Sequence, residues 1–193
     1  MNVALAENKY RNKIHPHKFA LMVACASMVM MFAALTSAYI VRQAQGNWLE
    51  FQLPVAFLFS TMVILLSSVT LQFAYFSFLK EKAATYKGLL GITFILGLAF
   101  LVLQYQGWLG LFDIGVEFNG NPSGSFVYVI SGLHAMHILA GIAVLFVALV
   151  HAYSLKFQVT NVRKRRLELT LIFWHFLGFL WIYLFLFFQL QQS

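Results

Sequence analysis

The sequence predicts an all-α protein, a polytopic membrane helix bundle with five transmembrane helices. Of its 193 residues, 61% are hydrophobic and 10% are charged, with a mean hydropathy of +0.79, whereas soluble domains carry about 25% charged residues. Five long segments lack Lys, Arg, Asp and Glu, and the last starts at Leu169. Each is long enough to cross a hydrocarbon core of about 30 Å as a helix. We expect helices at about 19–41, 53–79, 89–112, 125–155 and 167–190.

The predicted organisation is one membrane domain, 19–190, between an N-terminal segment, 1–18, and a short tail, 191–193. Connections between the spans are short, which excludes soluble enzymes and large extramembrane domains. The first apolar run follows a basic segment and lacks a cleavage site of small residues, so we expect a retained anchor. The one cysteine, Cys25, excludes a disulfide framework.

The basic residues predict the orientation of the bundle. With the N-terminus in the cytoplasm, every Lys and Arg except Arg42 lies on the inner side, as the positive-inside rule requires. The C-terminus then lies outside. We expect the run Arg163 to Arg166 to anchor the last helix at anionic headgroups, and we predict no nucleic-acid partner.

Polar and small residues inside the spans predict which helix faces turn toward protein, because polar groups avoid lipid tails. At 100° per residue, such residues gather on one face of each helix. We expect these faces to pack closely and to hydrogen-bond across helices. They hold Ser60, Ser67 and Ala74 in the second span, Thr93, Gly97, Phe100, Gln104 and Gly107 in the third, and Glu168, Leu171, His175, Gly178, Ile182 and Gln189 in the fifth.

The fourth span carries Ser131-Gly-Leu-His134-Ala-Met-His137, followed by Gly141. One interpretation is a haem or metal site that combines His134 and His137 with His175 of the fifth span. Because the spans offer neither Asp nor a second Cys as a further ligand, we prefer hydrogen bonds between helices. A small transporter or channel is another alternative, although the sequence has no visible inverted repeat.

These patterns resemble the subunit III family of haem-copper terminal oxidases, as in cytochrome c oxidase, in its compact five-helix bacterial form. The segment Ser131 to His137, with Gly141, is similar to the family's fourth-span motif. Glu168 followed by Trp174-His175-Phe176 and Trp181 resembles its last-helix signature. Partial matches elsewhere are Thr93, Gly97, Phe100 and Gln104 in the third span, Ser67-Ser68 in the second, and Ser27 with Ala38-Tyr39 in the first.

The chain departs from the family pattern at acidic positions. Met28 stands where the family commonly has Glu, and Gly178 stands where Asp commonly follows Trp-His-Phe. Gly107 also lies near a position where the family often has Glu. The missing acids argue against a proton-handling role for this chain, but they affect family membership less.

The resemblance implies a non-catalytic subunit of an aerobic respiratory oxidase in the bacterial inner membrane, with no redox cofactor on this chain. It places haem and copper on partner subunits I and II, and it implies bound phospholipid and a larger respiratory supercomplex as further partners. A quinol oxidase subunit III is the alternative within the family, and a haem-binding membrane cytochrome is the alternative outside it. Expected interhelix, lipid or subunit contacts are Tyr39, Ser67, Thr93, Gln104, His134, His137, Gly141, Glu168, Trp174, His175 and Trp181.

Overall fold

The computed structural model describes residues 16–191, which are helical apart from short connections. Most of the predicted N-terminal segment and the last two residues lie outside the described residues. Five helices are long and apolar enough to cross a membrane, which confirms the predicted all-α bundle. They are α2 (Pro16–Gln43), α3 (Val55–Leu79), α4 (Ala83–Asp113), α5 (Pro122–Ser154) and α6 (Asn161–Gln191).

Three helices extend into the basic residues beside the uncharged spans. α2 includes Lys18 and Arg42. α4 includes Lys87, and α6 includes the run Arg163 to Arg166. Long basic side chains reach water and headgroups from the end of a membrane helix, so their charge does not terminate it. At the start of α6, the Thr160 hydroxyl accepts the Arg163 backbone N–H at 3.3 Å. The uncharged segments are therefore shorter than these three helices.

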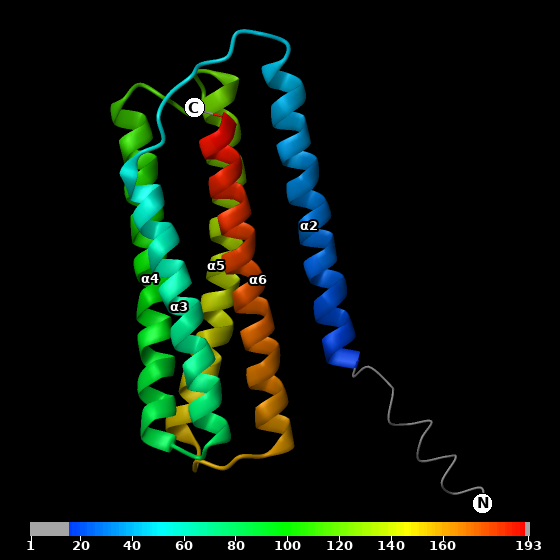
Figure 1. Ribbon diagram of the computed structural model, residues 1–193, viewed down its shortest axis with the longest axis vertical. Helices are drawn as coiled ribbons and strands as arrows, with labels where there is room; N and C mark the ends of the chain where they lie inside the picture. The colour runs from blue at the N-terminus through cyan, green and yellow to red at the C-terminus, as the bar shows by residue number, and fades with distance from the viewer. Residues whose placement is uncertain (1–15, 192–193) are drawn as a thin grey trace, which may run out of the picture.

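Four helices, α3 to α6, pack as a bundle, and α2 lies along the side formed by α5 and α6 (Figure 1). Within the bundle, α3 contacts α4 and α6, and α5 contacts the same two helices. A tight turn joins α3 to α4, with Glu81 at a φ of 57°. Every helix of the bundle thus has two bundle neighbours, whereas α2 packs on one side of it only.

The segment 44–54 crosses one end of the bundle from α2 to α3 (Figure 1). Asn121 holds it there, since its amide donates to the Asn47 carbonyl at 3.0 Å and its Oδ1 accepts the Leu49 N–H at 3.2 Å. The same Oδ1 accepts the Ser123 N–H at 3.0 Å and caps α5. One side chain therefore joins the start of α5 to the connection that positions α2.

The interior follows the predicted faces of α3 and α4 but not that of α6. All the residues predicted for the first two faces are buried. In α6, His175 is only half-buried and Gln189 is exposed. The two indoles, Trp174 and Trp181, instead occupy the centre of the bundle, because large rings fill its interior better than a polar stripe does. The buried face of α6 holds Leu167, Thr170, Trp174, Leu177, Gly178, Leu180, Trp181, Leu184 and Phe188.

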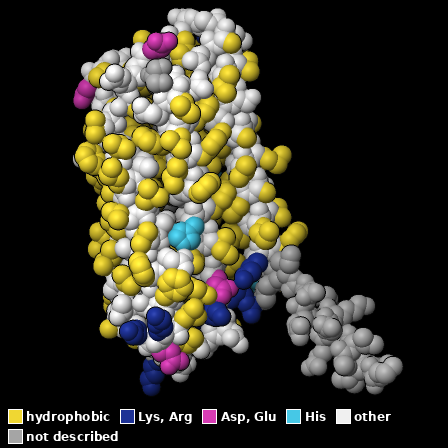
Figure 2. Space-filling model, viewed as in Figure 1, with side chains coloured by type: hydrophobic (Ala, Val, Ile, Leu, Met, Phe, Trp, Pro, Cys, Tyr) yellow, Lys and Arg dark blue, Asp and Glu magenta, His cyan; other side chains and the backbone are white. Residues whose placement is uncertain are grey.

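The outer surface has the layering of a membrane protein. Figure 2 shows hydrophobic side chains over the middle of the visible face and Lys and Arg gathered near one end. That end carries the turn between α3 and α4 and the start of α6 (Figure 1). Large apolar side chains such as Met30 and Phe179 are about three-quarters exposed, at 74% and 75%. Such a surface requires lipid or neighbouring subunits around it.

Candidate functional site

The first interior cluster is built around the indole of Trp174, which is buried between α3, α4 and α5. Its Nε1–H donates to the Ser67 hydroxyl at 3.1 Å, and that hydroxyl donates to the Thr93 carbonyl at 3.2 Å. The Thr93 hydroxyl also lies 2.9 Å from the hydroxyl of Thr70. This chain of hydrogen bonds ties α6 to α3 and α3 to α4. We call Ser67, Thr70, Thr93 and Trp174 the indole cluster.

Two glycines make room for this indole. A Cβ on Gly97 would lie 2.9 Å from Cη2 of Trp174, and a Cβ on Gly141 would lie 3.0 Å from Cζ3 of the same ring. The second Cβ would also lie 3.0 Å from Cδ1 of Leu177. Both distances are shorter than ordinary carbon contacts. The small residues predicted on α4 and α5 therefore allow a large ring to enter from α6.

The second interior cluster surrounds His134. Its imidazole is 0% exposed and stacks on the Trp181 indole, with centroids 5.2 Å apart and planes at 27°. Phe32 and Phe100 approach the ring edge-on at 6.3 and 6.0 Å. Neither ring nitrogen has a hydrogen-bond partner among the described residues. The expected interhelix hydrogen bond of His134 is therefore replaced by ring packing.

Gln104, like His134, is a buried polar side chain without a hydrogen-bond partner among the described residues. It is 1% exposed, and neither its amide nitrogen nor its oxygen has a partner among the described residues. Phe100, one turn before it on α4, touches His134, and Trp108, one turn after it, donates from Nε1 to the Ser131 hydroxyl at 2.9 Å. These contacts place Gln104 level with the segment between Ser131 and His134. We call Gln104 and His134 the unpaired polar cluster.

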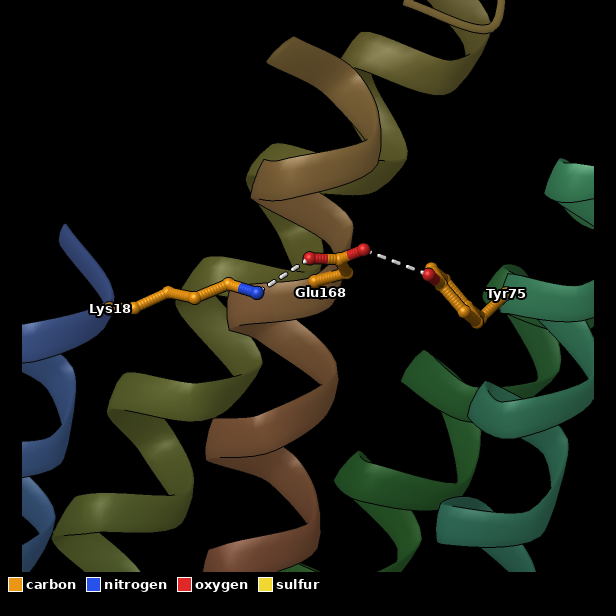
Figure 3. Close-up of polar contacts among 3 residues, drawn as sticks. All are labelled: Lys18, Tyr75 and Glu168. Carbon is orange, nitrogen blue, oxygen red and sulfur yellow. Dashed lines mark hydrogen bonds and ion pairs between the residues drawn. The ribbon is translucent and has the colours of Figure 1, made fainter. Parts of the chain in front are cut away.

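Glu168 forms the third cluster, near the end of the bundle that carries the basic residues. Its Oε2 lies 3.0 Å from the Lys18 Nζ, and its Oε1 accepts the Tyr75 hydroxyl at 3.0 Å (Figure 3). Lys18 belongs to α2, Tyr75 to α3 and Glu168 to α6. The carboxylate side chain is 22% exposed. We call these three residues the acid bridge, because one acid joins helices on both sides of it.

The remaining histidines make separate contacts. His137 Nδ1 lies 2.7 Å from the Leu133 carbonyl of its own helix, and His175 Nε2 lies 3.1 Å from Oε1 of Gln72 on α3. Within residues 16–191, no group of three or more His, Cys, Asp or Glu side chains could hold a metal ion. Phe32 contacts both His134 and His137 edge-on, whereas the hydrogen bond of His175 is to Gln72 on α3.

Other predicted residues lie in the packing around these clusters. The ring of Tyr39 is buried and contacts Trp48 edge-on at 4.6 Å, which fixes the end of α2 against the crossing segment. The Trp181 Nε1–H donates to the Thr61 hydroxyl on α3 at 2.9 Å. Both indoles of α6 are therefore hydrogen-bonded to hydroxyl groups of α3.

Sequence reasoning missed the partners in these contacts. Thr61 and Tyr75 each follow a residue of the predicted α3 face, and Gln72 lies two residues before Ala74. Their neighbours on α6 depend on how the two helices are rotated. A usable signal existed for the acid bridge. Lys18 and Glu168 have opposite charges and lie at the same membrane boundary in the predicted topology. A carboxylate at the end of a membrane helix is stabilised by pairing with a basic side chain, so this pair could have been predicted.

Comparison with known proteins identifies the family. The family model of cytochrome c oxidase subunit III matches residues 16–192. The chain is 30% identical to the cytochrome c oxidase subunit 3 of Corynebacterium diphtheriae, over 82% of this chain and 80% of that protein. It is 32% identical to the cytochrome bo(3) ubiquinol oxidase subunit 3 of Pseudomonas putida, over 65% of this chain and 59% of that protein.

A mammalian relative shows the same similarity over a smaller share of its own length. The cytochrome c oxidase subunit 3 of Mus musculus is 30% identical over 66% of this chain and 47% of that protein. The family model spans all five helices, including the positions of the indole cluster, the unpaired polar cluster and the acid bridge. This chain therefore belongs to the cytochrome c oxidase subunit III family and is a subunit III of a haem-copper oxidase.

Proposed function

We propose that this chain is a non-catalytic subunit that packs on subunit I of an aerobic respiratory oxidase and keeps the complex stable during turnover. The indole cluster supports this proposal most directly, because its polar groups hydrogen-bond to one another across three helices. Bonds of this kind stabilise and rigidify a membrane bundle.

In the proposed complex, subunits I and II hold the haem and copper that reduce oxygen to water. This chain supplies a rigid apolar surface for subunit contacts and for bound phospholipid, and a larger respiratory supercomplex is a further proposed partner. The proposed setting is the bacterial inner membrane. The proposed orientation places the N-terminus in the cytoplasm. With this orientation, all Lys and Arg residues of the chain except Arg42 lie on the cytoplasmic side of the membrane, as the positive-inside rule requires.

The acid bridge has a definite part in this proposal. α2 packs against α5 and α6 on one side of the bundle, and it makes the least extensive contact with the other helices of the described chain. The contact between Lys18 and Glu168 fastens its start, while Tyr75 orients the same carboxylate from α3. We infer that this bridge keeps α2 aligned with the bundle when neighbouring subunits assemble on it.

Cytochrome c is the proposed electron donor of the complex. The relatives from Corynebacterium diphtheriae and Nocardia farcinica, which carry the name cytochrome c oxidase subunit 3, align with 82% and 83% of this chain. A quinol oxidase is the second candidate, because the Pseudomonas putida protein with that name is 32% identical. The scaffold role is the same in both cases, since the donor binds other subunits.

A purification experiment tests the proposed function. We would tag this chain, extract native membranes in mild detergent, and identify the copurifying subunits together with the reduced-minus-oxidised spectrum. We expect two larger oxidase subunits and a haem spectrum that is lost when this chain is separated from them. A haem band that stays with the isolated chain, or copurification without an oxidase, would contradict the proposal and favour a cytochrome or a transporter.

A further inference from the structure

A pocket of about 370 Å³ opens at the end of the bundle where the connection between α4 and α5 lies. This is the end opposite the turn between α3 and α4. A pocket of this size is at the small end of the range for ligand sites and suits a headgroup better than a whole lipid. Its walls are Trp108, Leu109 and Phe112 from α4, Glu117, Phe118 and Asn119 from the connection, and Tyr128 from α5.

Hydrogen bonds fix the walls of this pocket. The Tyr128 hydroxyl lies 3.1 Å from the Trp108 carbonyl and 2.9 Å from the Val116 carbonyl, so it links both helices to the connection. The Ser125 hydroxyl donates to the Phe118 carbonyl at 2.6 Å. The Phe118 ring then meets the Tyr128 ring edge-on at 6.2 Å. Walls held in place before binding reduce the entropy lost when a ligand is ordered.

The chemistry of the lining favours a cation. Aromatic rings attract an ammonium group through their electron-rich faces, and the Glu117 carboxylate adds a negative charge. Neither Lys nor Arg lines the pocket. Arg42, at the same end of the bundle, donates to the Gly46 carbonyl of its own connection at 2.9 Å. The pocket therefore suits an ammonium group and offers no cation for a phosphate.

The surface beside the pocket favours a lipid as the source of such an ammonium group. Four exposed apolar or aromatic residues follow one face of α4 from the pocket toward the middle of the helix, at spacings of three and four residues. A stripe of this kind can receive an acyl chain whose headgroup lies in the pocket. The stripe is Phe112, Leu109, Tyr105 and Val102, which are 59%, 46%, 57% and 58% exposed.

We propose that this pocket binds the ammonium headgroup of a phosphatidylethanolamine molecule whose acyl chain lies along the α4 stripe. The proposal deepens the phospholipid binding in the proposed function and rests on it. Glu117 neutralises the ammonium charge, and the rings of Trp108, Phe118 and Tyr128 surround it. Selectivity against anionic lipids follows, since a headgroup of net negative charge would meet the carboxylate without a compensating cation.

The test uses the assembled oxidase purified through a tag on this chain and stripped of loosely bound lipid. Native mass spectrometry would follow the binding of added phosphatidylethanolamine and, separately, phosphatidylglycerol. We expect Glu117→Gln to weaken phosphatidylethanolamine binding about fivefold to tenfold and to strengthen phosphatidylglycerol binding, because the carboxylate that repels an anionic headgroup is gone. Glu50→Gln is the matched control, because Glu50 is exposed in the segment 44–54 at the same end but does not line the pocket.

A second variant keeps the charge and changes a ring. Phe118→Leu should weaken phosphatidylethanolamine binding about twofold to fivefold, by loss of one aromatic face. Equal binding of the two lipids, or equal binding by the parent and Glu117→Gln, would overturn the proposal. A map of the complex with a partner-protein side chain in the pocket would also overturn it. A tagged chain that brings down no oxidase would instead contradict the proposed function, so the two failures are distinguishable.

Discussion

The indole cluster and the unpaired polar cluster lie in the same bundle and use polar residues in opposite ways. In the indole cluster, Trp174 donates to Ser67, and Ser67 donates to Thr93. In the unpaired polar cluster, His134 and Gln104 are as deeply buried, yet their side-chain nitrogen and oxygen atoms have no partner among the described residues. Burial of a polar side chain in a membrane helix is thus no proof that it forms a hydrogen bond.

The difference has an energetic consequence. Removing one partner of a buried hydrogen bond leaves the other partner unsatisfied, which costs about 1–3 kcal/mol. Replacing a polar group that already lacks a partner by an apolar group of similar shape incurs no such cost. Substitutions in the indole cluster should therefore destabilise the subunit, and matched substitutions of the unpaired residues should not.

The largest effect is expected at Gly141, where a larger side chain would collide with the indole. Gly141→Val should destabilise the purified complex by about 1–3 kcal/mol or more, because its Cβ alone would lie 3.0 Å from both Trp174 and Leu177. The measurement is the thermal unfolding midpoint in detergent. Gly132→Val on the same helix is the control, since its Cβ would meet nothing within 4 Å. Equal midpoints for the two variants would refute the packing argument.

The second largest effect is expected from loss of the hydrogen bond to the Trp174 indole, not from a steric clash with it. Ser67→Ala leaves the buried Trp174 Nε1–H without its acceptor and should cost about 1–2 kcal/mol. Ser68→Ala, at the next position of α3, removes the same atom outside the indole cluster and should change the unfolding midpoint much less. If Ser68→Ala lowered the unfolding midpoint as much as Ser67→Ala, the hydrogen bond between the Ser67 hydroxyl and the indole would not be the cause of the destabilisation.

A smaller effect is expected at the acid bridge. Glu168→Gln removes the charge that Lys18 faces, and because Lys18 is 41% exposed, solvent screening limits the loss to about 0–1 kcal/mol. We expect the variant to give a lower yield of assembled oxidase than the parent at low salt, a difference that shrinks at high salt because salt weakens the ion pair of the parent. We also expect partial rescue by the exchange of Lys18→Glu with Glu168→Lys. The readout is the amount of haem that copurifies with the tagged chain. Complete salt independence, with no rescue, would argue against a role for the ion pair.

The smallest effect is expected for the unpaired polar cluster. Gln104→Met keeps the approximate length of the side chain and should lower the free energy of unfolding by less than about 1 kcal/mol, or raise it, so the unfolding midpoint should fall little or rise. Destabilisation as large as that of Ser67→Ala would show that Gln104 has a hydrogen-bond partner in the assembled complex, and the contrast between the two clusters would then disappear.

The five spans and the polar faces of α3 and α4 were predictable because the bilayer constrains them directly. A charge is excluded from each span, and Ser67 or Thr93 on a helix surface signals a protein contact. The buried face of α6 was not predictable in the same way. Trp174 and Trp181 are as compatible with a membrane interface as with the interior, and only the glycines on α4 and α5 decide that Trp174 enters the bundle.

The acid bridge and the pocket beside Glu117 could not be predicted from the sequence of any single helix. The meeting of Lys18, Tyr75 and Glu168 requires the rotation and the vertical offset of three helices. The pocket requires the path of the connection between α4 and α5, which brings Phe118 back onto Tyr128. Local periodicity predicts which side of a helix is polar, but it does not specify which neighbour that side will meet.

The proposed role of this subunit is to support the oxidase and not to carry out its chemistry. The most direct measurement compares the purified complex with and without this chain, following both the initial oxygen consumption per haem and the number of turnovers before activity is lost. For this role we expect an unchanged haem spectrum, a similar initial rate and a much shorter active lifetime without the chain. Loss of haem absorbance or of the initial rate, with the other subunits still assembled, would contradict it.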